Sequence, residues 1–270
     1  MKRISINEAR ERIRRAGLAY IMEEDNLQYL LGEGKTVQCL ADEDLLVILE
    51  PEEENQRYIH VLPFSESFCP AALTELLQES GANPVLLLNI RKLSHAFAEE
   101  LDSLLRREFI SERYIRDYLY TGETAPVPSL KVRLLNADDL DAFSAFPQEK
   151  IRYRPAPAVL FDVFVKKGQG QILARFDGER IVGYLALYEL TDTVYDSDYI
   201  YVLPEMRGKG IGRELTAAYA EYARRQNRSA YCSNAQNDIS ARTAVSAGFT
   251  PIRTVTKYKR KNENIQEESI

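Results

Sequence analysis

The stretch YIYVLPEMRGKGIG, residues 199–212, decides how the fold is interpreted. It begins as an apolar strand rich in tyrosine and β-branched residues and runs directly into a loop with three glycines. A helical pattern with one apolar stripe follows over 212–225. Strand, glycine-rich loop and helix in this order indicate a layered α/β fold, in which the loop can approach a ligand closely.

The strand at the start of this stretch has a second copy earlier in the chain. YIHVLP at 58–63 matches YIYVLP at 199–204 in five of six positions. A pattern F-x-x-x-R-x-x-x-x-Y begins at Phe109 and again at Phe249, at nearly the same offset. Two apolar strands can share VLP by chance, but the elements between the matches also follow one order. We therefore interpret the chain as an internal repeat.

The repeat predicts two domains joined by a linker. The first is expected over 1–121 and the second over 131–261. The segment between them, 122–130, belongs to a run rich in glycine and proline without hydrophobic periodicity, which indicates a linker. The polar tail at 262–270 is expected to be disordered.

Composition excludes several classes of protein. A net charge of −6 argues against a general nucleic-acid binder. Three cysteines and two histidines without metal spacing favour neither a disulfide framework nor a metal site. The charged N-terminus is not a signal peptide, and no run of about 18 apolar residues predicts a membrane span. We expect a protein of the reducing cytoplasm, with no membrane partner.

The loop at 207–212, RGKGIG, has the chemistry of an anion site. Its N–H groups and those of the first helical turn lack helical partners, and the helix dipole reinforces their attraction for negative charge. Arg207 and Lys209 add positive charge, so a diphosphate is the expected guest. The spacing fits neither G-x-G-x-x-G near the chain start nor a P-loop.

These residues resemble the GNAT acetyltransferase family. Residues 202–212 are similar to the family's motif A, R/Q-x-x-G-x-G/A after a strand. Asn237-x-x-Ser240 with Gly248–Phe249 resembles the motif B helix, and KVRLLNADDLDAF (131–143) resembles the opening strand and first helix. The resemblance covers about 130–260. It implies a mixed α/β sheet that splays between the strands ending at Val202 and Asn234, and, with the repeat, a tandem of two GNAT-like units.

The resemblance also implies acetyl-CoA as the cofactor, held between the splayed strands. The pyrophosphate would bind the loop, and the pantetheine amides would pair with the strand edge as an added strand does. Asn237 and Ser240 would face the cofactor arm. The implied cofactor-binding residues are Tyr201, Val202, Leu203, Arg207, Gly208, Lys209, Gly210, Ile211, Gly212, Arg213, Asn237 and Ser240.

Acetyl transfer to an amine needs a base, because an alkylammonium with a pKa near 10 must lose a proton before it attacks. Asp196 and Asp198 precede the cofactor strand, and a two-residue period places both on one face. Some family members use a carboxylate on this strand, so these two are the candidate bases, with Glu189 third. The alternative is a solvated hairpin loop whose acids only keep the turn soluble.

The expected proton donor is absent from the motif B helix. Family members often carry a tyrosine seven residues after the motif asparagine, where this chain has Ala244. Departure of the thiolate would then depend on water, Tyr231, Cys232 or Ser246. For Tyr231 and Cys232, the other reading is that of ordinary strand residues.

The first copy of the strand leads into a different loop, SESFCP at 65–70. Glu66 would repel a phosphate and Pro70 lacks a donor N–H, so we expect no coenzyme A there. His60 stands where the second copy has Tyr201, and its expected role is structural. The first half is expected to complete the sheet, to wall the substrate cleft or to mediate formation of a homodimer.

The sequence therefore predicts an acetyl-CoA-dependent N-acetyltransferase. It would move the acetyl group to a primary amine of a small molecule or peptide by direct attack within a ternary complex. A non-catalytic acyl-CoA-binding or regulatory protein is the alternative, because the usual tyrosine is missing. Aminoacyl transfer by a tandem GNAT-like enzyme is a third possibility, which the intact RGKGIG loop disfavours.

Overall fold

The computed structural model describes residues 1–53, 56–79, 84–90, 93–120, 122, 129–147, 155–235 and 238–261. Most of the predicted linker and all of the predicted tail lie outside these residues. The chain forms two compact units. Unit 1 contains Met1–Ile115 and Ile252–Ile270, and unit 2 contains Arg116–Pro251.

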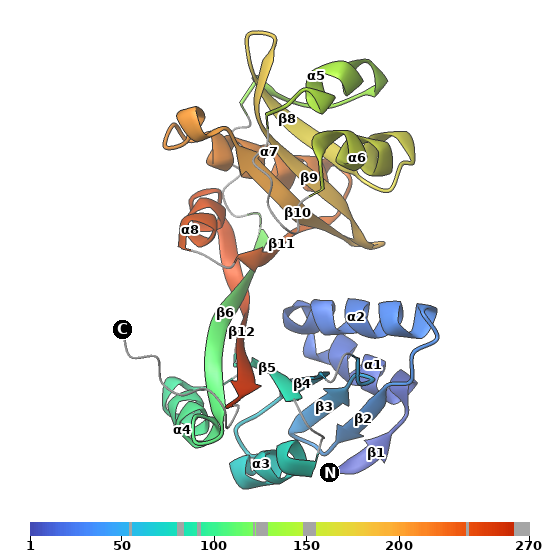
Figure 1. The fold of residues 1–270 in the computed structure, drawn as a ribbon, viewed down its shortest axis with the longest axis vertical. Helices are drawn as coiled ribbons and strands as arrows, with labels where there is room; N and C mark the ends of the chain where they lie inside the picture. Colours follow the sequence, from blue (N-terminus) through green and yellow to red (C-terminus); the bar gives the residue numbers. More distant parts are fainter. Residues whose placement is uncertain are drawn as a thin grey trace. The chain divides into compact units, whose positions relative to one another are not determined.

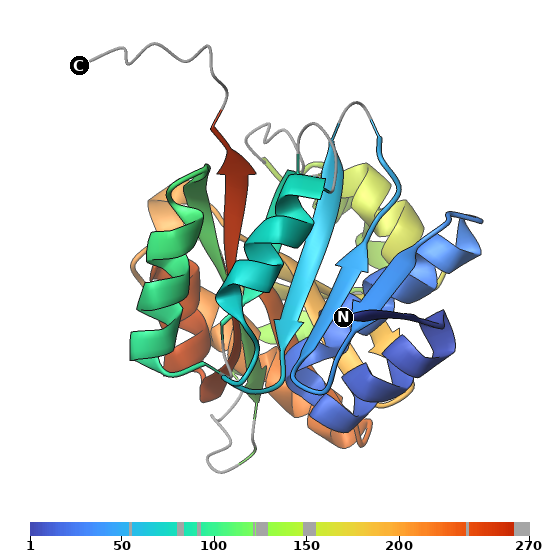
Figure 2. The ribbon, with the colours of Figure 1, turned by 90° about the horizontal axis from the view of Figure 1, so that it is seen from below.

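Unit 1 is a mixed sheet with helices on both faces (Figures 1 and 2). One face packs against α3 and α4 and the other against α1 and α2. Its helices are α1 (Ile6–Ala16), α2 (Ile21–Gly32), α3 (Pro70–Glu79) and α4 (His95–Leu105). Its sheet follows the order β1 (Lys2–Ile4), β2 (Gln38–Ala41), β3 (Leu45–Leu49), β4 (Arg57–Pro63), β5 (Pro84–Asn89) and β12 (Phe249–Arg260).

Unit 2 repeats this plan (Figure 1). Its sheet follows the order β6 (Phe109–Tyr120), β11 (Ser229–Ala235), β10 (Val194–Val202), β9 (Arg180–Thr191), β8 (Gln171–Asp177) and β7 (Val132–Leu134). Its helices are α5 (Leu140–Ser144), α6 (Pro157–Phe161), a π-helical turn (Asp162–Lys166), α7 (Ile211–Arg225) and α8 (Asp238–Ser246).

The strands of the two units follow the same sequence of pairings. In unit 1, β3–β4 is antiparallel, β4–β5 is parallel and β5–β12 is antiparallel. In unit 2, β9–β10 is antiparallel, β10–β11 is parallel and β11–β6 is antiparallel. The repeated strand motif thus occupies corresponding strands, β4 and β10. The predicted mixed α/β fold built from a repeat is confirmed.

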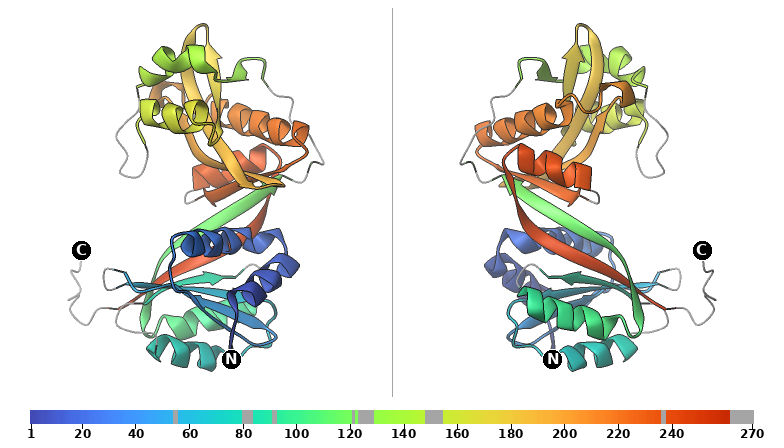
Figure 3. Two further views of the ribbon diagram at one scale, coloured as in Figure 1. Left: turned by 90° about the vertical axis from the view of Figure 1, so that its right-hand side faces the viewer. Right: turned by 90° about the vertical axis from the view of Figure 1, so that its left-hand side faces the viewer.

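The last strand of each half of the sequence pairs with a strand of the other half: β6 with β11, and β12 with β5 (Figure 3, β6 in green and β12 in red). Strand β6 begins in unit 1 with Phe109 in the core, and its end pairs with β11 in unit 2, where Tyr118 lies opposite Cys232. Strand β12 begins in unit 2 with Phe249, and its end pairs with β5 in unit 1. The compact units therefore differ from the predicted domains, because β12 completes the sheet of unit 1.

In unit 2, α5 and α7 cover opposite faces of the sheet. Gly183 faces α7, because a Cβ placed there would lie 3.2 Å from Ile211 and 3.3 Å from Leu215. The next residue, Tyr184, faces α5 and meets the Phe143 ring edge-on, with centroids 5.1 Å apart. Successive strand residues point to opposite faces, so the β9 side chains that follow Tyr184 alternate between the α7 side and the α5 side.

Candidate functional site

Strands β10 and β11 form a fork. Within the described residues their parallel pairing runs from Val194 opposite Ser229 only as far as Asp196 opposite Tyr231. Strand β10 then continues beside β9 to Val202, after a register shift between Ser197 and Tyr199. The corresponding strands of unit 1, β4 and β5, pair at five positions instead of three. The splay expected from the sequence is therefore present in unit 2.

Tyr219 of α7 ties the closed end of the fork together. Its hydroxyl oxygen lies 2.6 Å from the Tyr195 carbonyl oxygen of β10 and accepts the Tyr231 N–H of β11 at 2.8 Å. Tyr219 is fully buried, and burial raises the pKa of its hydroxyl well above the ordinary value. The hydroxyl therefore stays protonated as a hydrogen-bond link between the strands where they begin to part.

The glycine-rich loop lies at the open end of the fork. Gly208 has φ +75° and Gly210 has φ +80°, a backbone region that other L-residues adopt at a cost. Gly210 is the N-cap residue of α7, and no side chain caps that helix end. The N–H groups of the first turn have no intrahelical partners and are available to an anion. This backbone is compatible with an anion site, and the assignment of that site stays a prediction.

Contacts within unit 2 hold this loop against the end of β10. The Leu203 N–H donates to the Val182 carbonyl of β9 at 3.0 Å. Arg207 Nε donates to the Val202 carbonyl at 3.2 Å, and the guanidinium lies 5.6 Å from the centre of the Tyr201 ring. Gly183 has no side chain, so the first turns of α7 pack closely against β9. This packing places the N-terminus of α7 near the end of β10. Arg207 and Lys209 are both exposed there.

Asp196 lies at the branch point of the fork. Its side chain is 1% exposed. Oδ1 accepts the Ser233 N–H of β11 at 3.0 Å, just beyond the last strand pair. Oδ2 accepts a hydrogen bond from the Tyr188 hydroxyl of β9 at 3.3 Å. The carboxylate thus receives a bond from each neighbouring strand and takes the place that a backbone carbonyl would hold if the ladder continued.

The other two candidate bases lie differently. Asp198 falls within the register shift of β10, which interrupts the two-residue period on which its predicted face depended, and its side chain is outside the described residues. Glu189 is 59% exposed and forms an ion pair with Arg228 at 2.9 Å. Of the three, Asp196 is the one that the structure places in the fork. The assignment of a base remains a prediction.

A second tyrosine–aspartate pair lies beside the first. Tyr231 Oη donates to Asp117 Oδ2 of β6 at 2.7 Å, and both side chains are fully buried. Asp196 and Tyr231 lie opposite each other on β10 and β11, so the two pairs share one face of the sheet. Asp117 is not among the residues predicted from the sequence, because it lies in the first half of the chain, on a strand not expected to join this sheet.

The remaining possible proton donors are poorly suited to protonate a leaving thiolate. Burial raises the pKa of the Cys232 thiol to about 12, and Ser197 Oγ donates to its sulfur at 3.1 Å. Ser246 is exposed at the end of α8 and donates to the Thr243 carbonyl. Ala244 is buried and apolar. Ser240 lies on α8 as predicted, whereas Asn237 lies outside the described residues.

The loop after the first strand copy is occupied by the protein's own side chains. The Glu66 carboxylate accepts the backbone N–H of Ser94, the N-cap residue of α4. Ser65 donates to the Asp44 carboxylate. The Glu66 carboxylate is therefore already bonded within unit 1, to the N-cap residue of α4. The expectation that unit 1 does not bind coenzyme A remains a prediction.

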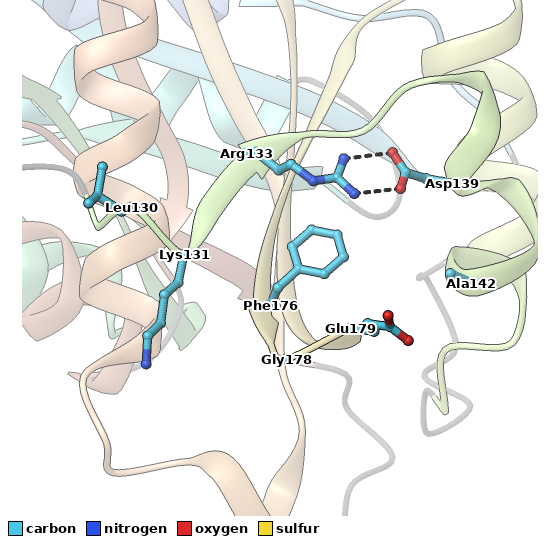
Figure 4. A pocket seen from close by; sticks show the side chains of 8 residues that line it. All are labelled: Leu130, Lys131, Arg133, Asp139, Ala142, Phe176, Gly178 and Glu179. Atoms are coloured by element: carbon cyan, nitrogen blue, oxygen red, sulfur yellow. Dashed lines mark hydrogen bonds and ion pairs between the residues drawn. The ribbon is translucent and has the colours of Figure 1, made fainter.

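A shallow hollow on unit 2 is lined by both charged and uncharged residues (Figure 4): Leu130, Lys131, Arg133, Asp139, Ala142, Phe176, Gly178 and Glu179. Arg133 and Asp139 face each other across it in a bidentate ion pair, with distances of 2.8 and 2.7 Å. The guanidinium also lies 4.3 Å from the centre of the Phe176 ring. Asp139 is part of the capping box that begins the helical segment leading into α5. The charged groups Arg133 and Asp139 are thus bonded to each other, and we interpret the hollow as part of the structural connection between β7 and α5.

The model of the acetyltransferase (GNAT) family matches residues 133–249. Residues 133–249 form a GNAT domain. It includes the fork and the glycine-rich loop, so the family match and the geometry concern the same residues. No curated protein matches the chain. The GNAT family supports acyl transfer as the general chemistry of this domain.

Solved structures extend the likeness in fold to most of the chain. A GNAT-family acetyltransferase from Colwellia psychrerythraea aligns over 96% of this chain and 99% of its own, with a TM-score of 0.61 and 13% identity. A Drosophila protein aligns over 96% and 98%, with a TM-score of 0.55 and 16% identity. A GCN5-related N-acetyltransferase from Sphaerobacter thermophilus aligns over 92% of each chain, with a TM-score of 0.53 and 16% identity.

None of the helices that the structure describes is long and apolar enough to cross a membrane.

Proposed function

We propose that the chain is an acetyl-CoA-dependent N-acetyltransferase that acts on a primary amine of a small molecule or peptide. One observation carries the proposal. The fork between β10 and β11 opens toward the same end of β10 at which the glycine-rich loop begins α7. A chain-like cofactor with an anionic diphosphate at one end fits this combination of slot and anion site.

The residues present fit the cofactor in shape and charge. The N–H groups from Gly208 to Gly212 would bind the diphosphate, and Lys209 and Arg213 would add positive charge at the exposed surface. Tyr201 and Val202 of β10, together with Leu203 after the strand, would accompany the pantetheine arm where β11 has diverged. Bound acetyl-CoA supplies an activated acetyl group as a thioester.

Asp196 would act as the base that accepts a proton from the acceptor ammonium. The carboxylate lies at the closed end of the slot, and two hydrogen bonds hold it in place. Ala244 has no proton to give, so departure of the thiolate would rely on water or another group. That absence favours the second candidate function, an acyl-CoA-binding protein without turnover.

Calorimetric titration with coenzyme A tests the cofactor site. Gly210→Glu should weaken binding by at least about 100-fold, because it places a carboxylate where the diphosphate would lie. Gly34→Glu is the matched control. Gly34 also has positive φ, +69°, and open space within 4 Å of the position that a Cβ would take, but it lies in unit 1. Equal affinity in both variants would refute the site.

Turnover separates the two candidate functions. Release of coenzyme A from acetyl-CoA is followed across a panel of alkylamines, polyamines, amino acids, aminoglycosides and peptides. Acceptor-dependent release identifies an acetyltransferase. Binding of coenzyme A without release on any amine supports the non-catalytic candidate and contradicts the proposed enzyme.

A further inference from the structure

Tyr188 is hydrogen-bonded to the buried Asp196 carboxylate and is itself only partly buried. Asp196 and Tyr188 are cross-strand partners on β10 and β9, so they share a face. Tyr184 lies four residues before Tyr188 on the same strand and packs against α5. Tyr188 and Asp196 therefore point to the α5 side of the sheet, opposite α7.

The burial of Asp196 limits how it can act on an acceptor. Only 1% of the residue is exposed, and the Ser233 N–H and the Tyr188 hydroxyl already bond to its two oxygens. A hydrated alkylammonium cannot reach such a carboxylate without displacing part of the sheet. Tyr188 is only partly buried. Of the two hydrogen-bonded groups Tyr188 is the less buried, so it is the one through which a proton from outside the sheet would reach the Asp196 carboxylate.

We propose that Tyr188 is the proton relay between the acceptor amine and Asp196. This inference rests on the proposed N-acetyltransferase function. The ammonium N–H bond breaks and its proton passes to Tyr188 Oη, while the original Tyr188 proton passes to Asp196 Oδ2. Tyr188 ends the step neutral, Asp196 ends it protonated, and the nitrogen gains a free electron pair. That pair would form the new N–C bond at the thioester carbonyl carbon, and the C–S bond would break with its electron pair leaving on the coenzyme A sulfur as a thiolate. The second proton that the attacking nitrogen loses would pass through water to this thiolate.

The neighbouring Tyr231–Asp117 pair does not offer the same route. Both of its members are fully buried, and the Tyr231 hydroxyl already donates to Asp117 at 2.7 Å. Of these two hydroxyls on the sheet face, only the one on Tyr188 combines partial exposure with a bond to the candidate base. The relay is therefore assigned to a single side chain that phenylalanine can replace without loss of the ring.

The test compares Tyr188→Phe with wild type in acetyl-CoA turnover with the best acceptor of the amine panel. At neutral pH kcat should fall by about 100-fold, the lower end of general acid–base contributions. The deficit should shrink as the pH approaches the pKa of the amine, because free amine then needs no relay. Calorimetric affinity for coenzyme A should stay within about threefold of wild type, since Tyr188 is not part of the proposed cofactor site.

Tyr120→Phe is the matched control. Tyr120 is also a partly buried tyrosine of unit 2, and it packs against Phe249 at 5.4 Å between ring centroids. It should keep wild-type kcat at every pH. A Tyr188→Phe deficit that stays constant with pH would show a structural effect and refute the relay, as would unchanged kcat. Failure of the wild type to turn over any amine would instead refute the proposed function.

Discussion

Substitution of Asp196 separates its part in the sheet from its part in chemistry. Asparagine keeps an oxygen for the Ser233 N–H, whereas alanine leaves that N–H without its acceptor. An unsatisfied buried donor costs about 1–3 kcal/mol, and Ser233 is only partly buried, so about 1–2 kcal/mol is expected here. Asp196→Ala should therefore be less stable than Asp196→Asn by this amount.

Both variants should lose acetyl transfer by about 10²–10⁴-fold, because neither can accept a proton. Thermal unfolding should show a melting temperature about 2–6 °C lower for Asp196→Ala than for Asp196→Asn. Turnover is measured as release of coenzyme A. Asp192→Asn is the control, since it makes the same chemical change at an exposed position in the turn between β9 and β10.

Two results would contradict this reasoning. If Asp196→Asn keeps kcat/KM within about threefold of wild type, Asp196 is not the base, since a lost general base costs far more. If the alanine and asparagine variants unfold at the same temperature, the carboxylate does not replace the missing backbone acceptor at the fork. The two readouts are independent, so one half of the argument can fail without the other.

Two further predictions concern titratable groups. Burial raises the thiol pKa of Cys39 to about 11 and of Cys232 to about 12, while Cys69 is exposed. At pH 8 the native protein should take up one equivalent of maleimide quickly at Cys69, as mass spectrometry of its peptides can check; equally fast labelling of Cys232 would contradict its burial. Hydrogen bonds from Arg133 hold the pKa of Asp139 below its ordinary value. The ionised form therefore stabilises the fold at neutral pH, and this contribution is lost as the pH falls below about 4 through the lowered pKa. Chemical denaturation should show a smaller loss of stability over that range in Asp139→Asn than in wild type; equal losses would count against the pair.

Local features of the site could be predicted from the sequence because they depend on adjacent residues. The strand motif, the glycines with positive φ and the start of α7 lie within one short stretch, and each is dictated by local backbone chemistry. The helix predicted over 212–225 forms at nearly those residues, as α7. A strand that ends in a glycine-rich turn can therefore be predicted from the local sequence alone.

Features that depend on distant pairing could not be predicted. Strand β6 was visible only as part of a repeated pattern, and nothing local shows that its end pairs with β11 rather than β5. The contact of Asp117 with Tyr231 therefore could not be predicted. The register shift between Ser197 and Tyr199 also has no local signal, yet it decides which side chains of β10 share a face. The position of Tyr188 opposite Asp196 likewise follows only from the register of β9 and β10.

The exchange of last strands explains what the first half of the chain contributes to the GNAT domain. Residues 116–120 of β6 form the ladder beside β11, which otherwise would expose an open sheet edge next to the fork. Asp117 on this strand holds Tyr231, and the Tyr231 N–H in turn bonds to Tyr219 at the branch point. A boundary drawn at the predicted linker would remove that strand from the domain it supports. The first half therefore supplies a structural part of the candidate site through β6. Its own strands β4 and β5 form no comparable fork, because they pair at five positions.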